Sequence, residues 1–207
     1  MSDDSRARYE SVKRGAGTLL TGALSALVVM LVILGVMWGV EVVDYVLDGT
    51  LDHEFGIIGW RVDGLDGILF APFLHVGFGH LMANSLPLLV LGFLAAVRGL
   101  GRFLAASALI MVIGGLGTWL SSPDITTVGA SGLIFGYFGY VVCRGLFDRS
   151  ALDILIGVGV AVAYYSILWG LLPNQQGISW QGHLFGLIGG VVAAWALRRK
   201  RPAALPS

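Results

Sequence analysis

This chain of 207 residues has little charge and a single cysteine. Charged side chains make up 13% of the residues, about half of the share in a typical soluble domain, and the mean hydropathy is +0.82. An ordinary soluble domain is therefore excluded. The lone Cys143 excludes an internal disulfide and a cluster of thiolate metal ligands. Because the formal net charge is zero, the overall charge gives no indication of a nucleic-acid partner.

Hydrophobic residues make up 56% of the chain and gather in six long runs. A helix that crosses a bilayer needs about 20 apolar residues, and the short fourth run reaches that length when it continues past Arg144. The 31 glycines are spread through the runs, where small residues let membrane helices approach closely. The sequence therefore predicts an all-α, polytopic membrane protein with six transmembrane helices, at residues 18–43, 68–97, 103–120, 128–142, 152–172 and 178–197.

The basic residues predict how these helices are oriented. If the N-terminus is cytoplasmic, 12 of the 13 basic residues lie in the inner segments, and only Arg61 lies outside. Six acidic residues between Asp44 and Asp66 cluster in the first outer segment. Lysine and arginine are enriched on the cytoplasmic side of membrane proteins. We therefore predict six membrane spans, with both termini in the cytoplasm.

This topology divides the chain into a cytoplasmic segment (residues 1–17), a six-helix membrane domain (18–197) and a basic cytoplasmic tail (198–207). The first apolar run is longer than the roughly 7–15 residues of a signal-peptide core, so we expect a retained anchor. Both end segments are too short for a further soluble domain. The tail is expected to lie against anionic lipid, and the apolar residues within segment 44–67 indicate partial burial at the membrane interface.

Five polar residues are predicted to lie at one depth in the outer half of the bilayer. Ser131 and His183 each follow an outer loop by a few residues, and His75, His80 and Asn84 lie on the second run. At 1.5 Å per residue most of them fall roughly 5–20 Å below the outer surface. Each alone is explained by hydrogen bonds within or between helices. Because three helices place such residues at the same level, we predict a single functional site.

The residue types at this level suit nucleophilic catalysis. A serine becomes a good nucleophile when a base removes its proton during attack, and neutral histidine is the usual base. We therefore predict that Ser131 and His183 form a pair. No carboxylate lies at the same depth, and Asp124 lies in an outer loop, so the prediction is a dyad without an acidic third member.

The same level offers donors for a tetrahedral oxyanion, which needs preorganised hydrogen bonds. The backbone amides at the start of the fourth helix, near Ser131, have no partner within the helix. The side chains of His80 and Asn84 can also donate. Gly129 and Gly132 flank the serine and allow a substrate backbone to approach closely.

Three motifs carry these residues in order along the second, fourth and sixth runs: HVGFGHLMAN at residues 75–84, GASG at 129–132 and HLFGLIGG at 183–190. They resemble the signatures of the rhomboid intramembrane serine proteases. The resemblance implies a six-helix rhomboid-like bundle in a bacterial plasma membrane, with a site that opens to the outer side and uses neither cofactor nor metal. One departure is that Trp60-Arg61 lie farther from His75 than the Trp-Arg pair of many members, and Asp66-Gly67 occupy the expected place.

The resemblance also implies roles for individual residues. Ser131 is the nucleophile, His183 the general base and acid, and the oxyanion hole consists of the Ser131 amide, His80 and Asn84. His75 supports the site. An aromatic residue packs on the catalytic imidazole, and glycines form a close seam between the fourth and sixth helices; these residues are Phe135, Gly132, Gly136, Gly186 and Gly190. The fifth helix is expected to act as a gate.

The function predicted from these observations is an intramembrane serine endopeptidase that cleaves transmembrane segments of other membrane proteins. One alternative is a catalytically inactive relative that binds or escorts membrane helices, although the presence of both Ser131 and His183 argues against it. Another is a transporter or metal permease that uses His75, His80 and His183. That alternative requires further ligands or acids within the spans, and the inner half has neither.

Overall fold

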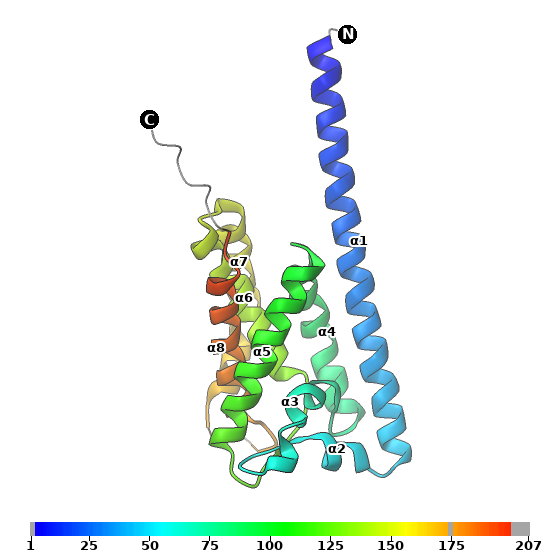
Figure 1. The fold of residues 1–207 in the computed structure, drawn as a ribbon, viewed down its shortest axis with the longest axis vertical. Coiled ribbons are helices and arrows are strands. Elements are labelled where there is room, and N and C mark those ends of the chain that lie inside the picture. The colour runs from blue at the N-terminus through cyan, green and yellow to red at the C-terminus, as the bar shows by residue number, and fades with distance from the viewer. Residues whose placement is uncertain (1–2, 174–175, 200–207) are drawn as a thin grey trace.

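The computed structural model describes residues 3–173 and 176–199. Long helices lie side by side, and short elements close one end of the bundle, which we call the α2–α3 end (bottom of Figure 1). The elements in chain order are α1 (Asp3–Val46), α2 (Thr50–Phe55), β1 (Ile57–Ile58), η1 (Val62–Gly64), α3 (Gly67–Phe70), η2 (Ala71–Phe73), α4 (Gly77–Ala96), α5 (Leu100–Ser121), β2 (Thr126–Thr127), α6 (Ser131–Asp148), α7 (Ala151–Ala163), η3 (Tyr165–Leu171) and α8 (Trp180–Ala196), where η marks a 3-10 helix.

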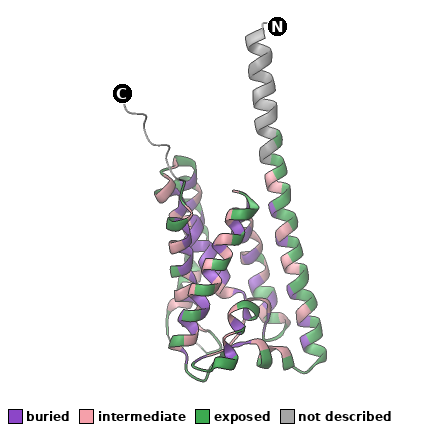
Figure 2. Ribbon diagram, viewed as in Figure 1, coloured by how far each residue is buried: buried purple, intermediate pink, exposed green. Residues whose placement is uncertain are grey.

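Three of the described helices are long and apolar enough to cross a membrane: Leu20–Val46, Gly77–Ala96 and Leu100–Ser121. A fourth candidate consists of α7 and η3, which meet at a bend of 65°. Many residues of these helices are exposed (green in Figure 2), and they include large apolar side chains, as expected of a surface that faces lipid. The chain is therefore a helical, polytopic membrane protein.

Each of the six predicted runs contains one long helix or the α7–η3 pair, but three details differ from the prediction. In the second run, the continuous helix begins at Gly77. Pro72 and the positive φ of Gly77 (81°) prevent it from beginning earlier. The fifth run bends at Tyr164, between α7 and η3. The described residues also include a short antiparallel sheet, β1–β2, so they are not purely α-helical.

The helix α6 lies at the centre of the bundle and packs against α4, α5, α7 and α8. Nine consecutive residues, 133–141, are buried, so no side of this helix faces lipid over that stretch. The helix α1 lies at one edge and packs mainly on α4 (Figure 1). Its buried residues include Met30 and Met37, and many of its other apolar side chains are exposed.

Glycines bring α8 against α6. A Cβ atom on Gly186 would lie 2.2 Å from the carbonyl oxygen of Gly132, and one on Gly190 would lie 1.9 Å from that of Gly136. By contrast, a Cβ on Gly136 would meet Ile110 of α5, and one on Gly132 would make an ordinary contact at 3.5 Å. The contacts at Gly132 and Gly136 therefore require glycine on the α8 side. Farther along, α6 supplies the glycine, since a Cβ on Gly139 would lie 2.8 Å from the carbonyl oxygen of Leu187 in α8.

The segment between α1 and α4 is folded against the loop that precedes α6. Ile57 pairs with Thr127 in the β1–β2 sheet, and the amide of Asp124 donates to the carbonyl of Gly59. Ile57 is buried, whereas Trp60 is exposed and donates from its indole nitrogen to the carbonyl of Leu120 (2.8 Å). These contacts close the α2–α3 end around the residues that begin α6.

At the opposite end, a charged cluster joins three helices. Asp153 of α7 is fully buried and pairs with Arg98, which follows α4, and with Arg144 of α6 at 3.3 Å. Arg144 also donates to the carbonyl of Leu94 (3.0 Å) and lies over the ring of Tyr140. This cluster was not predicted from the sequence.

Candidate active site

Ser131 and His183 lie in hydrogen-bond contact at the α2–α3 end, although 52 residues separate them in the sequence. The distance from Ser131 Oγ to His183 Nε2 is 2.8 Å. Ser131 is the first residue of α6, and His183 lies in the first turn of α8, which Ser179 caps by accepting from the amide of Gly182. The two helices begin at the same end of the bundle and touch through glycines, so their first turns bring the hydroxyl and the imidazole together.

The His183 ring is held on two further sides. It is stacked on Phe135, with 4.2 Å between ring centroids and 11° between planes. Its Nδ1 lies 2.8 Å from the carbonyl oxygen of Gly170 in η3. A carbonyl oxygen only accepts hydrogen bonds, so Nδ1 donates and carries the proton of the neutral ring. The Nε2 lone pair is then directed at the hydroxyl of Ser131. The contact with Gly170 was not predicted.

His80 and Asn84 approach the backbone just before the serine. Gly129 has a φ of 123°, and a Cβ atom there would lie 2.8 Å from Cε1 of His80 and 3.8 Å from Nδ2 of Asn84. Asn84 is 8% exposed, and its Nδ2 has no hydrogen-bond partner among the described residues. An unpartnered buried donor is costly unless something binds it. It is therefore available for an oxyanion.

A cavity of about 220 Å³ connects these donors to the dyad. Its lining includes His80, Asn84, Ser131 and His183. The amides of the first helical residues have no partner within an α-helix, so the Ser131 amide adds a third donor to the side-chain donors of His80 and Asn84. A carbonyl carbon next to Ser131 Oγ can thus place its oxygen near several N–H groups.

His75 supports the backbone of the same segment. It is 1% exposed, and its Nε2 accepts a hydrogen bond from the amide of Ala130 at 3.3 Å. Its ring lies edge-on to that of His80, with centroids 5.1 Å apart. The carbonyl of Ala71 accepts a second bond, from the amide of Gly129 (2.9 Å). These contacts fix the segment just before the serine, and they place His75 outside the Ser131–His183 pair.

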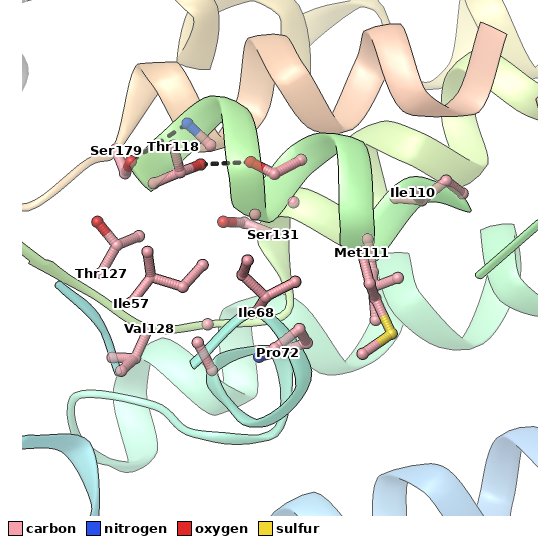
Figure 3. Close-up of a pocket in the computed structure, with 17 residues that line it drawn as sticks. Ile57, Ile68, Pro72, Ile110, Met111, Thr118, Thr127, Val128, Ser131 and Ser179 are labelled. Carbon is pink, nitrogen blue, oxygen red and sulfur yellow. Dashed lines mark hydrogen bonds between the residues drawn. The ribbon is translucent and has the colours of Figure 1, made fainter. Parts of the chain in front are cut away.

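A second, smaller cavity lies on the other side of Ser131 and measures about 50 Å³. Figure 3 shows it between Ser131 and the side chains of Ile57, Ile68 and Pro72. Most of its lining is apolar, and the Thr118 hydroxyl at its edge donates to the carbonyl of Gly114 (2.7 Å). The space adjoins the serine hydroxyl, so a small apolar group fits next to it.

These features define a helical membrane protein with a partly buried serine–histidine pair, and comparison with known proteins identifies its family. The family model described as Rhomboid domain matches residues 60–200. The chain is 46% identical over 177 residues to the uncharacterized protein Rv1337 of Mycobacterium tuberculosis. The matched residues cover 81% of this chain and 73% of Rv1337. The chain therefore belongs to the rhomboid family.

Two other relatives are named as proteases. The chain is 35% identical over 125 residues to rhomboid protease GluP of Bacillus subtilis, covering 60% of this chain and 24% of GluP. It is 30% identical over 135 residues to rhomboid-like protease 5 of Toxoplasma gondii, covering 64% of this chain and 16% of that protein. Both matches span only a part of a much longer protein.

Proposed function

We propose that this protein is an intramembrane serine endopeptidase that cleaves transmembrane segments of other membrane proteins. The observation that carries the proposal is the 2.8 Å contact between Ser131 Oγ and His183 Nε2 within the bundle. Polar groups in a membrane interior are costly to maintain and usually serve a function. The names of the relatives from Bacillus subtilis and Toxoplasma gondii support the same class of activity.

In the first half of the proposed reaction, Ser131 Oγ attacks the scissile carbonyl carbon while Nε2 of His183 takes the hydroxyl proton. The carbonyl oxygen becomes an oxyanion and accepts hydrogen bonds from the Ser131 amide, Asn84 and His80. His183 then gives its proton to the amide nitrogen of the leaving group. The C–N bond breaks, and the acyl group remains on Ser131.

In the second half, a water molecule attacks the acyl carbon while His183 Nε2 takes one of its protons. The tetrahedral intermediate uses the same three donors. It collapses as the Ser131 oxygen leaves and recovers a proton from His183. The products are a carboxylic acid and an amine, and the dyad returns to its starting state.

The proposed topology has six spans with both termini in the cytoplasm and the site opening to the outer side. The helices α6 and α8 have 18 and 17 residues, and together with the α7–η3 pair they complete six spans. The charged cluster at Arg98, Arg144 and Asp153 then lies toward the cytoplasm. Part of the predicted basic tail, residues 200–207, lies outside the described residues.

The proposed substrate is a transmembrane helix with a locally unwound stretch. The carbonyls of a regular helix are hydrogen-bonded within the helix, and Ser131 reaches one only when the chain is extended. Small or helix-breaking residues in the substrate lower the free energy of that unwinding. The small cavity next to Ser131 supports a small side chain at the cleavage site.

The test uses purified full-length protein in liposomes with a fluorescent transmembrane substrate. We expect cleavage by the wild type and by Ser121→Ala, a control serine whose hydroxyl donates within its own helix to the carbonyl of Gly117. We expect no cleavage by Ser131→Ala or His183→Ala. A fluorophosphonate should label the wild type and not Ser131→Ala. Undiminished turnover in Ser131→Ala would refute the proposal.

A further inference from the structure

The hydrogen bond between His183 and Gly170 joins the dyad to the segment that follows α7. The chain bends by 65° between α7 and η3. This bend carries the carbonyl of Gly170 to 2.8 Å from Nδ1 of His183. The acceptor is therefore a main-chain oxygen, at the place where a carboxylate stands in many serine hydrolases.

Only glycine fits at this position. A Cβ atom on residue 170 would lie 2.8 Å from His183 Nδ1 and 3.1 Å from Cζ of Phe135. The imidazole is already stacked on Phe135, so the ring cannot give way on that side. An added methyl group would instead move the η3 backbone away from the ring and lengthen the hydrogen bond.

We propose that the carbonyl of Gly170 is a positioning group that holds His183 in the tautomer required of a base. Neutral imidazole exists as two tautomers, and only the form with the proton on Nδ1 presents a lone pair at Nε2. The carbonyl stabilises that form by accepting the Nδ1 hydrogen. In the other tautomer Nδ1 has no hydrogen, so the carbonyl oxygen would face a nitrogen lone pair without a donor between them. This inference rests on the proposed function, because it names the group that positions His183 as the base of the proposed reaction.

The carbonyl also acts during attack. When His183 takes the serine proton, its ring becomes an imidazolium, and the Nδ1–H···O=C bond becomes charge-assisted. Such bonds are roughly twice as strong as neutral ones. The interaction is therefore stronger in the transition state than before it, and its loss should lower kcat more than it changes KM.

The first experiment measures the tautomer directly, by nitrogen NMR of histidine-labelled full-length protein in detergent. The chain has four histidines, and His183→Ala assigns the signal. In the wild type we expect a protonated Nδ1 and an unprotonated Nε2. In Gly170→Ala we expect both tautomers. We expect no such change in Gly159→Ala, because a Cβ atom on this glycine of α7 would have no described atom of another element within 4 Å.

The second experiment weakens the acceptor without adding any side-chain atom. Replacing Leu171 by its α-hydroxy acid turns the Gly170 carbonyl into that of an ester, which is a poorer acceptor. The same replacement at Leu168 weakens the carbonyl of Ile167 and is the matched control. We expect the Leu171 ester to reduce kcat about tenfold, the loss of one hydrogen bond, with little change in KM.

A wild-type ring protonated on Nε2, or an unchanged tautomer and kcat in both the alanine and the ester variants, would overturn the positioning role. The NMR signal reports whether the hydrogen bond to Gly170 fixes the tautomer of His183 in the protein without substrate. If the wild type neither cleaves nor reacts with the fluorophosphonate, the proposed function fails, and the tautomer measurement still decides whether the carbonyl controls the ring.

Discussion

Gly186 of α8 lies against the carbonyl oxygen of Gly132 so closely that a Cβ atom would come within 2.2 Å of it. Both residues adjoin the dyad, so a side chain on Gly186 separates Ser131 from His183. A displacement of about 1 Å can reduce turnover about 100-fold, and we expect a loss of that order in Gly186→Val. The control is Gly39→Val on α1, where a Cβ atom would have no described atom of another element within 4 Å. Turnover at the wild-type rate in Gly186→Val would contradict the role of this contact.

The unpartnered amide of Asn84 gives a second prediction. Removing one oxyanion donor typically lowers kcat by about 10²–10³-fold, and we expect a loss in that range for Asn84→Ala with a small change in KM. Ser85→Ala is the control, because the Ser85 hydroxyl donates to the carbonyl of Leu81 and accepts from the indole of Trp38, away from the cavity. The comparison needs kcat and KM measured separately with the transmembrane substrate. A rise in KM at constant kcat would assign Asn84 to substrate binding instead.

The sequence could predict the residues of the site because membrane geometry limits where they lie. The ends of the apolar runs indicate the depth of Ser131 and His183 in the membrane. The positions of the motifs along the chain indicate which helices carry these residues. The structure accordingly brings these two residues within 2.8 Å, with Phe135 stacked on the ring. Depth in the membrane does not show which helix faces contact each other. Two of the four glycines predicted for the seam, Gly132 and Gly136, could therefore carry a Cβ atom without a clash with α8.

The contact with Gly170 could not be predicted for a different reason. A carbonyl oxygen is present in every residue, so no residue type marks one that accepts a functional hydrogen bond. The bend at Tyr164 lies inside an unbroken apolar run without proline. Likewise, the sequence shows Asp153 near the start of the same run, but its pairing with Arg144 depends on how α7 packs against α6. Both features arise from tertiary packing.

The charged cluster at the end opposite the dyad predicts a stability effect. Asp153→Asn leaves Arg144, which is 3% exposed, without its buried anion. Breaking a buried ion pair in this way costs about 3–5 kcal/mol. The control Asp63→Asn breaks an exposed pair with Arg61, which contributes about 0–1 kcal/mol. Unfolding in detergent, followed by circular dichroism, measures both. Equal stability of the two variants would show that the cluster does not stabilise the bundle.

Asp52 predicts that stability depends on pH. Its burial, with the nearby charges of Asp44 and Glu41, raises the pKa of this carboxyl from 3.8 to about 7. The folded state therefore binds a proton that the unfolded chain releases at lower pH. The resulting stabilisation is fully present below the pKa of the unfolded chain, and it is lost as the pH rises from about 4 to 7. We expect the melting temperature in detergent to fall over that interval.

The matched variants separate this effect from other titrations. Asp52→Asn keeps the shape of the side chain and removes its proton equilibrium, so the decline in melting temperature between about pH 4 and 7 should become smaller. Asp63→Asn should leave the decline in place, because the hydrogen bond from Arg61 lowers the pKa of Asp63 and its titration lies below this interval. A decline of the same size in Asp52→Asn would mean that another group binds the proton.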